Sequence, residues 1–194
     1  MEPAGYLPST THAWIGLYAG VSYHHYYLEP RLEELVASVG RYRLFTLSDK
    51  DFITTRTTYR LNLTGPTMTI QTACSTSLVA VYVASQRPLI GVVLVSPYDS
   101  MRNIAQDIYF YVPVSLLLKH HFDALALAPA IKIPMLALIA EPDHIIPPKH
   151  AFALIEAWGG VTQQKIIPNT NHNDIQLEEG YWESITAFLN SILK

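Results

Sequence analysis

The chain has 194 residues, of which 49% are hydrophobic and 15% charged, and its net charge is −3 at pH 7. This composition is typical of a globular protein with a buried core and excludes a disordered chain. The 13 basic residues form no run that could follow a phosphate backbone, so we do not expect nucleic acid as a partner.

Cysteine content and hydropathy exclude further kinds of site. The single cysteine, Cys74, can form neither an internal disulfide nor a zinc site of several thiolates. The longest apolar stretch, 76–98, is interrupted at Gln86-Arg87-Pro88, so it lacks the ~20 consecutive apolar residues of a membrane span. The first residues have neither the basic nor the apolar region of a signal peptide. We therefore expect a cytoplasmic chain with no membrane span, no metal and no cofactor.

Short apolar runs alternate with longer segments of helical periodicity, which is typical of parallel strands joined by helices. The predicted strands are 14–20, 67–71, 90–95, 134–139 and 164–167, and the predicted helices are 31–39, 51–61, 75–85, 103–110, 149–158 and 181–193. The segment 113–127 is interpreted as a lid or connector with partial helix. These elements predict a three-layer α/β fold, with a largely parallel sheet of about five strands and flanking helices.

Cys74 follows the strand at 67–71 and precedes an apolar helix. Although an isolated cysteine is usually a small buried hydrophobe, this position places the sulfur at a helix N-terminus. Unpaired N–H groups and the helix dipole favour the thiolate there, and the same N–H groups could stabilise a carbonyl oxygen that becomes negative. Both effects suit acyl transfer through a thioester.

The stretch 65–80 closely resembles the active-site signature of β-ketoacyl synthases of polyketide and fatty-acid synthesis. The resemblance extends back to about residue 5 through the segments 15–22, 49–56 and 59–66. It implies that Cys74 is an acyl-accepting nucleophile, with an acyl carrier protein as a candidate partner. Condensation is not expected, because the family needs two later histidines, one of them in a His-Gly-Thr-Gly-Thr segment, and no histidine of this chain precedes a glycine.

Residues from about 79 to 194 resemble the C-terminal half of serine α/β-hydrolases of the peptidase- and esterase-like type. The segments 91–100, 133–147 and 166–174 carry the resemblance, which implies Asp143 as the acid and His172 as the base of a triad. In a triad the carboxylate orients the imidazole, which takes the proton of the nucleophile. Both loops follow strands of one predicted sheet, so we expect Asp143 to accept a hydrogen bond from His172. The neighbouring His144 and His150 are interpreted as residues of a solvated loop edge.

An ungapped alignment places Cys74 on the nucleophilic serine of the hydrolases, so that Cys74, Asp143 and His172 follow the hydrolase order of nucleophile, acid and base. Thr72 and Thr76 stand where the hydrolase turn has glycine, and their side chains would crowd a strained backbone.

Three functions therefore stay open for two joined fragments, 1–80 and 81–194. The first is an acyltransferase-like chain acylated at Cys74, and the second is a thioester or ester hydrolase that uses Cys74, His172 and Asp143. The third is an inactive fusion or chimera of two enzyme fragments. We predict that the fragments pack as one compact domain, with the strand at 67–71 beside and parallel to that at 90–95, because the pattern strand, turn, helix, strand runs unbroken across the join.

Overall fold

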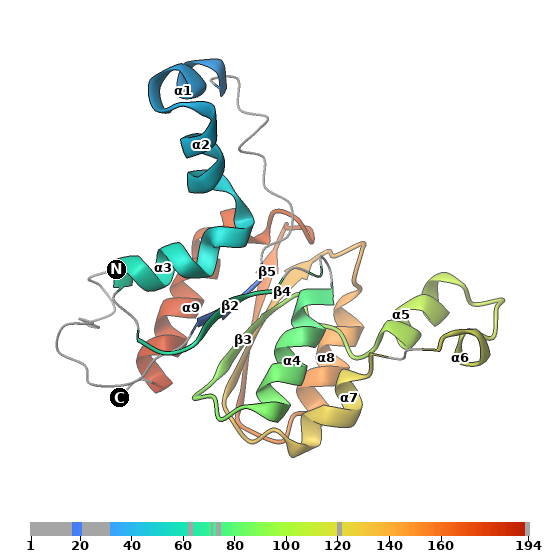
Figure 1. The fold of residues 1–194 in the computed structure, drawn as a ribbon. Helices are drawn as coiled ribbons and strands as arrows, with labels where there is room; N and C mark the ends of the chain where they lie inside the picture. Colours follow the sequence, from blue (N-terminus) through green and yellow to red (C-terminus); the bar gives the residue numbers. More distant parts are fainter. Residues whose placement is uncertain are drawn as a thin grey trace. The chain divides into compact units, whose positions relative to one another are not determined.

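The computed structural model describes residues 17–20, 32–61, 64–70, 72, 75–119 and 122–192 (Figure 1). The chain divides into two compact units, Met1–Thr76 and Ser77–Lys194. This boundary lies close to the join that the sequence places near residue 80. That the two fragments form one compact domain stays a prediction.

The described elements of the first unit are β1 (Leu17–Ala19), α1 (Leu32–Val39), α2 (Arg41–Ser48), η3 (Lys50–Phe52), α3 (Ile53–Leu61) and β2 (Thr67–Thr69). β1 and β2 pair in parallel, with Leu17 opposite Thr67. A parallel pair needs a crossover connection, and the helical segment between the two strands supplies it. Thr54 and Thr58, one turn apart on α3, hold this helix to β2 through hydroxyl contacts with Thr69 and Thr67.

The elements of the second unit are α4 (Thr76–Gln86), β3 (Val92–Val95), α5 (Met101–Ile108), α6 (Val114–Leu117), α7 (Ala124–Leu127), η5 (Ala128–Ala130), β4 (Met135–Glu141), α8 (Pro148–Ala157), β5 (Thr162–Pro168), η6 (Ile175–Leu177) and α9 (Glu179–Ile192). The strands form a parallel sheet in the order β3-β4-β5. This order and the three strands agree with the sequence prediction.

β4 is the centre of the second unit, and it is buried from Met135 to Ala140. Met135 and Ala137 pack with apolar residues of α4 and α8. Leu136, Leu138 and Ala140 point to the opposite face and pack with apolar residues of α9. In Figure 1 the green α4 and the orange α8 cover one face of the sheet, and the red α9 covers the other. The predicted three-layer arrangement is thus present, because successive side chains of a strand point to opposite faces.

One prediction about the sheet is wrong. The sequence predicted about five strands in one sheet, with the strand at 67–71 beside that at 90–95. In the structure β2 pairs with β1 and β3 pairs with β4, in separate sheets of two and three strands. Backbone hydrogen bonds from Leu17 N to Pro66 O and from Ile70 N to Ala19 O extend the pairing of β1 with β2. A strand–turn–helix–strand pattern gives the order of elements along the chain but not the hydrogen-bonding partner of each strand.

The helices agree with the prediction apart from shifts at their ends, and α2 is an addition that the sequence did not predict. The segment 113–127 contains the two short helices α6 and α7, as its interpretation as a partly helical connector implied. Residues 14–16, 71 and 193 of the predicted elements lie outside the described residues. In the described part of the chain, no helix combines the length and the apolar character that a membrane crossing requires.

Replacing Phe188 with alanine is expected to lower the free energy of unfolding by about 3–5 kcal/mol. Phe188 lies on α9, is 1% exposed and belongs to the core cluster that includes Leu136 and Leu138. Urea unfolding followed by tryptophan fluorescence measures the change. The neighbouring Leu189 is 37% exposed, and its replacement with alanine is the matched control. Equal effects of the two substitutions would contradict the assignment of Phe188 to the core.

Candidate acid–base site

Asp143 lies in the loop between β4 and α8, where the protein backbone fixes its carboxylate. Its side chain is 1% exposed. Oδ1 accepts hydrogen bonds from the backbone N–H groups of Ile145, at 2.9 Å, and Ile146, at 2.8 Å. Ile146 is itself buried in the core, so the turn around Asp143 is anchored by apolar packing. This leaves Oδ2 as the oxygen that can face a partner outside the loop.

That partner is His172, in the loop after β5. Its Nδ1 lies 2.8 Å from Oδ2 of Asp143. Because a carboxylate can only accept, Nδ1 carries the proton, and Nε2 is then the nitrogen that can accept one. The His172 side chain is 14% exposed. The hydrogen bond expected from the sequence is therefore present.

The loop of His172 is tied to the loop of Asp143 through the backbone. Thr170 is buried, donates from its hydroxyl to Ile167 O, and donates its N–H to Glu141 O at the end of β4. Asn169 adopts a positive φ of 57°, a conformation that asparagine tolerates better than most residues and that turns the chain after β5. These contacts hold both loops at the carboxyl edge of the same parallel sheet, where ligands of open α/β sheets bind.

The environment of Asp143 favours its charged form. Burial alone would raise the pKa of this carboxyl. The hydrogen bonds from His172 and from the N–H groups of Ile146 and Ile145 outweigh burial and hold the pKa below its ordinary value of 3.8. Asp143 is therefore a carboxylate at neutral pH, as the orientation of an imidazole requires.

Acid should weaken the fold through Asp143. Its folded-state pKa is depressed, so its contribution to stability is present above about pH 4 and is lost as the pH falls through the lowered folded value. Urea unfolding at a series of pH values from neutral downward measures this loss. The Asp143→Asn variant should show a smaller loss over the same range, because an amide does not titrate. An unchanged pH profile in that variant would contradict the assignment.

Cys74, the predicted nucleophile, lies outside the described residues. The residues on either side of it are described: Ser75 N donates to Thr72 O at 3.0 Å, and Thr72 Oγ1 donates to Thr76 Oγ1 at 3.4 Å. The two threonines that replace the glycines of a hydrolase turn are thus in contact with each other. Cys74 belongs to the first unit, whereas Asp143 and His172 belong to the second. That the three act together stays a prediction.

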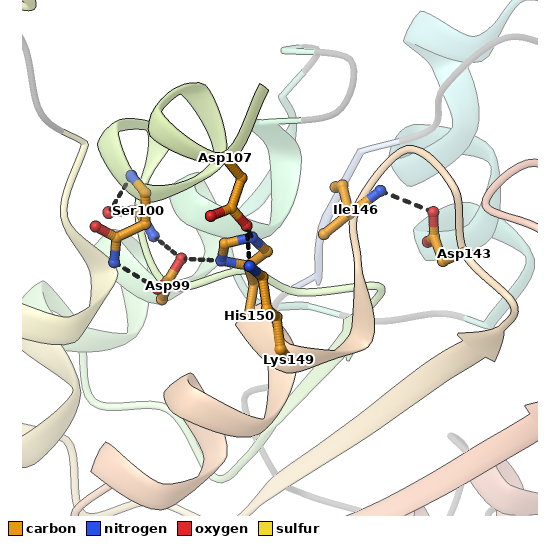
Figure 2. A network of polar contacts seen from close by, with 8 residues as sticks. Asp99, Ser100, Asp107, Asp143, Ile146, Lys149 and His150 are labelled. Atoms are coloured by element: carbon orange, nitrogen blue, oxygen red, sulfur yellow. Dashed lines mark hydrogen bonds and ion pairs between the residues drawn. The ribbon is translucent and has the colours of Figure 1, made fainter. Parts of the chain in front are cut away.

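Sequence reasoning missed a second polar cluster in this unit, which is centred on His150. His144 is exposed, as expected for a solvated loop edge, but His150 is only 4% exposed and that interpretation is wrong for it. Its ring contacts Asp99 and Asp107 from two other segments (Figure 2). Among the described residues no cluster of three or more His, Cys, Asp or Glu side chains has the arrangement of a metal site.

Comparison with known proteins separates the two halves of the chain. The model of the β-ketoacyl synthase N-terminal domain matches residues 1–87. The phenolphthiocerol/phthiocerol polyketide synthase of Mycobacterium tuberculosis includes a polypeptide that is 38% identical over 99 residues, which are 47% of this chain and 7% of that polypeptide. An uncharacterized protein of the same organism is 29% identical over 102 residues, which are 53% of this chain and 36% of that protein. The chain thus spans only a minor part of either relative.

Among solved structures, acetyl xylan esterase 1 from Thermoanaerobacterium sp. JW/SL YS485 superposes with a TM-score of 0.51 at 18% identity. The match covers 69% of this chain and 49% of the esterase, and at this identity it shows the fold alone. The chain therefore joins a segment similar to the N-terminal domain of β-ketoacyl synthases to a second half with the fold of α/β-hydrolases.

Proposed function

We propose that the chain hydrolyses acyl thioesters or esters, with Cys74 as nucleophile, His172 as general base and Asp143 as the residue that orients His172. The observation that carries the proposal is the hydrogen bond between a buried carboxylate and His172 Nδ1. It fixes the tautomer in which Nε2 accepts a proton. The pair lies at the carboxyl edge of a parallel sheet, where a substrate can approach.

The proposed reaction has two steps. In the first, His172 Nε2 takes the proton of Cys74, the sulfur attacks the carbonyl carbon, and the same proton passes to the departing thiol or alcohol. In the second, His172 Nε2 takes a proton from water, the resulting hydroxide attacks the acyl group on sulfur, and the proton returns to the cysteine as the carboxylic acid leaves. Asp143 keeps its charge throughout and stabilises the imidazolium that forms in each step.

A second candidate function is acyl transfer that stops at a thioester on Cys74. The match of residues 1–87 to the β-ketoacyl synthase domain favours it, because the cysteine of that family's signature accepts an acyl group. An acyl carrier protein would then be the donor or acceptor. This function needs Cys74 but does not need the Asp143–His172 pair.

Incubation of the full chain with a short-chain acyl thioester of N-acetylcysteamine tests both candidates. Product acid is measured by chromatography and the acyl-enzyme by intact-protein mass. Continuous release of acid supports the hydrolase. One acyl group per chain that persists supports acyl transfer. Neither product overturns both candidates and leaves an inactive fusion, and the Cys74→Ala variant measures the background of both readouts.

A further inference from the structure

His150 is a buried histidine with a carboxylate at each ring nitrogen (Figure 2). It is the third residue of α8. Nδ1 lies 2.9 Å from Oδ1 of Asp99, in the segment between β3 and α5, and Nε2 lies 3.0 Å from Oδ2 of Asp107, near the end of α5. The side chains of His150 and Asp99 are 4% and 6% exposed, whereas that of Asp107 is 36% exposed. His150 therefore connects three segments of the second unit.

The contacts of Asp99 require it to be charged. Oδ1 also accepts from Ser100 N at 2.6 Å, and Oδ2 accepts from the side-chain amide of Asn103 at 2.6 Å. A carboxylate that only accepts, buried in the protein, is costly unless a cation lies beside it. His150 is the group with which Asp99 forms an ion pair in the described part of the chain.

The ring of His150 must donate from both nitrogens. A neutral imidazole has one N–H and one lone pair, so one of the two carboxylates would then face a lone pair. Protonation of both nitrogens satisfies both carboxylates and gives a buried imidazolium. Lys149 pairs with Asp107 from the exposed side, which leaves two acidic and two basic groups in the cluster.

The cluster lies at one end of the loop whose other end carries Asp143. Residues 142–147 connect β4 to α8. At the front of this loop Asp143 accepts the N–H groups of Ile145 and Ile146, and at its back His150 N donates to Pro147 O at 3.1 Å. Figure 2 shows both ends of the loop in one view. The position of the first turn of α8 therefore determines where the loop holds the Asp143 carboxylate.

We propose that His150 is a positioning residue: as an imidazolium between Asp99 and Asp107, it fixes the start of α8 and thereby the loop that presents Asp143 to His172. Its effect on catalysis rests on the proposed function, because it acts through Asp143. Its effect on the Asp143–His172 hydrogen bond does not depend on the reaction.

The protonation state is tested on the unmodified protein. Proton–nitrogen correlation spectra of the chain with ¹⁵N-labelled histidine distinguish ring nitrogens that carry a proton from those that do not. We expect both nitrogens of His150 to carry one. A His150 ring with one bare nitrogen in the folded protein overturns the proposal.

The positioning role is tested with His150→Gln, and His144→Gln is the matched control, since His144 is exposed and lies in the same loop. We expect loss of the hydrogen-bonded His172 Nδ1–H resonance in His150→Gln and its retention in His144→Gln. A folded His150→Gln protein that keeps this resonance unchanged overturns the proposal. Should His150→Gln fail to fold, Asp107→Asn removes the charge of the more exposed partner. Exchange of the His172 proton with water should then be faster than in wild type, and unchanged exchange overturns the proposal.

Kinetics separate this proposal from the proposed function. If the chain turns over thioesters, His150→Gln should lower kcat by about 10²-fold with KM unchanged, as a small misplacement of a catalytic group does. His144→Gln should keep wild-type kcat. Because the His172 resonance reports the hydrogen bond with or without turnover, a chain that hydrolyses nothing overturns the proposed function alone. A resonance that survives in His150→Gln overturns the positioning role alone.

Discussion

Replacing His172 with alanine is expected to lower kcat for an acyl thioester by about 10⁴-fold or more. The substitution removes the only group that the proposed reaction uses to move protons between nucleophile, leaving group and water. The fold should persist, because the side chain lies at the surface of the loop after β5 and is 14% exposed. Initial rates over a range of substrate concentrations measure the effect.

His144→Ala is the matched control for that loss. His144 is an exposed histidine next to Asp143 in sequence, so it tests whether removal of any imidazole near the site lowers the rate. We expect its kcat to stay within about twofold of wild type, as for a surface substitution. Comparable losses in both variants would mean that His172 is not the specific base.

Replacing Asp143 with asparagine should lower kcat by about 10⁴-fold while it leaves the loop in place. The asparagine oxygen can still accept from Ile145 and Ile146, which now bond to Oδ1. The amide group then faces His172 Nδ1 and donates to it, so the imidazole proton moves to Nε2. A protonated Nε2 cannot take the proton of the nucleophile.

The tautomer of His172 provides the second readout for Asp143→Asn. In wild type we expect the proton on Nδ1, and in the variant on Nε2, as nitrogen chemical shifts of the ring distinguish. A variant with the proton on Nε2 and a wild-type kcat would show that the orientation of His172 by Asp143 is not needed for turnover.

Much of the second unit could be predicted from sequence because its signals are local. The apolar runs of β3 and β4 and the periodicity of α8 and α9 each lie within one element. The Asp143–His172 contact followed from a simple rule, since loops after neighbouring parallel strands meet at one edge of the sheet. The two residues are nevertheless 29 positions apart in the sequence.

The features that sequence reasoning missed depend on partners distant along the chain. The pairing of β2 with β1 joins strands that are separated by the helices α1, α2 and α3. His150 is buried because Asp99 and Asp107, 51 and 43 residues away, meet its ring. A polar residue in a loop-like context reads as exposed until such partners are known, because burial of a charge is tolerated only when it is paired.

The central claim, that His172 serves Cys74, is tested most directly by the rate at which iodoacetamide alkylates the thiol at neutral pH. Cys74 is the single cysteine of the chain, so the mass of the bound label reports on this thiol alone. If the imidazole draws the thiol proton, alkylation of wild type should be about tenfold faster than that of His172→Ala, because the thiolate is the reactive form. Equal rates in the two proteins would contradict the claim and leave Cys74 without a base.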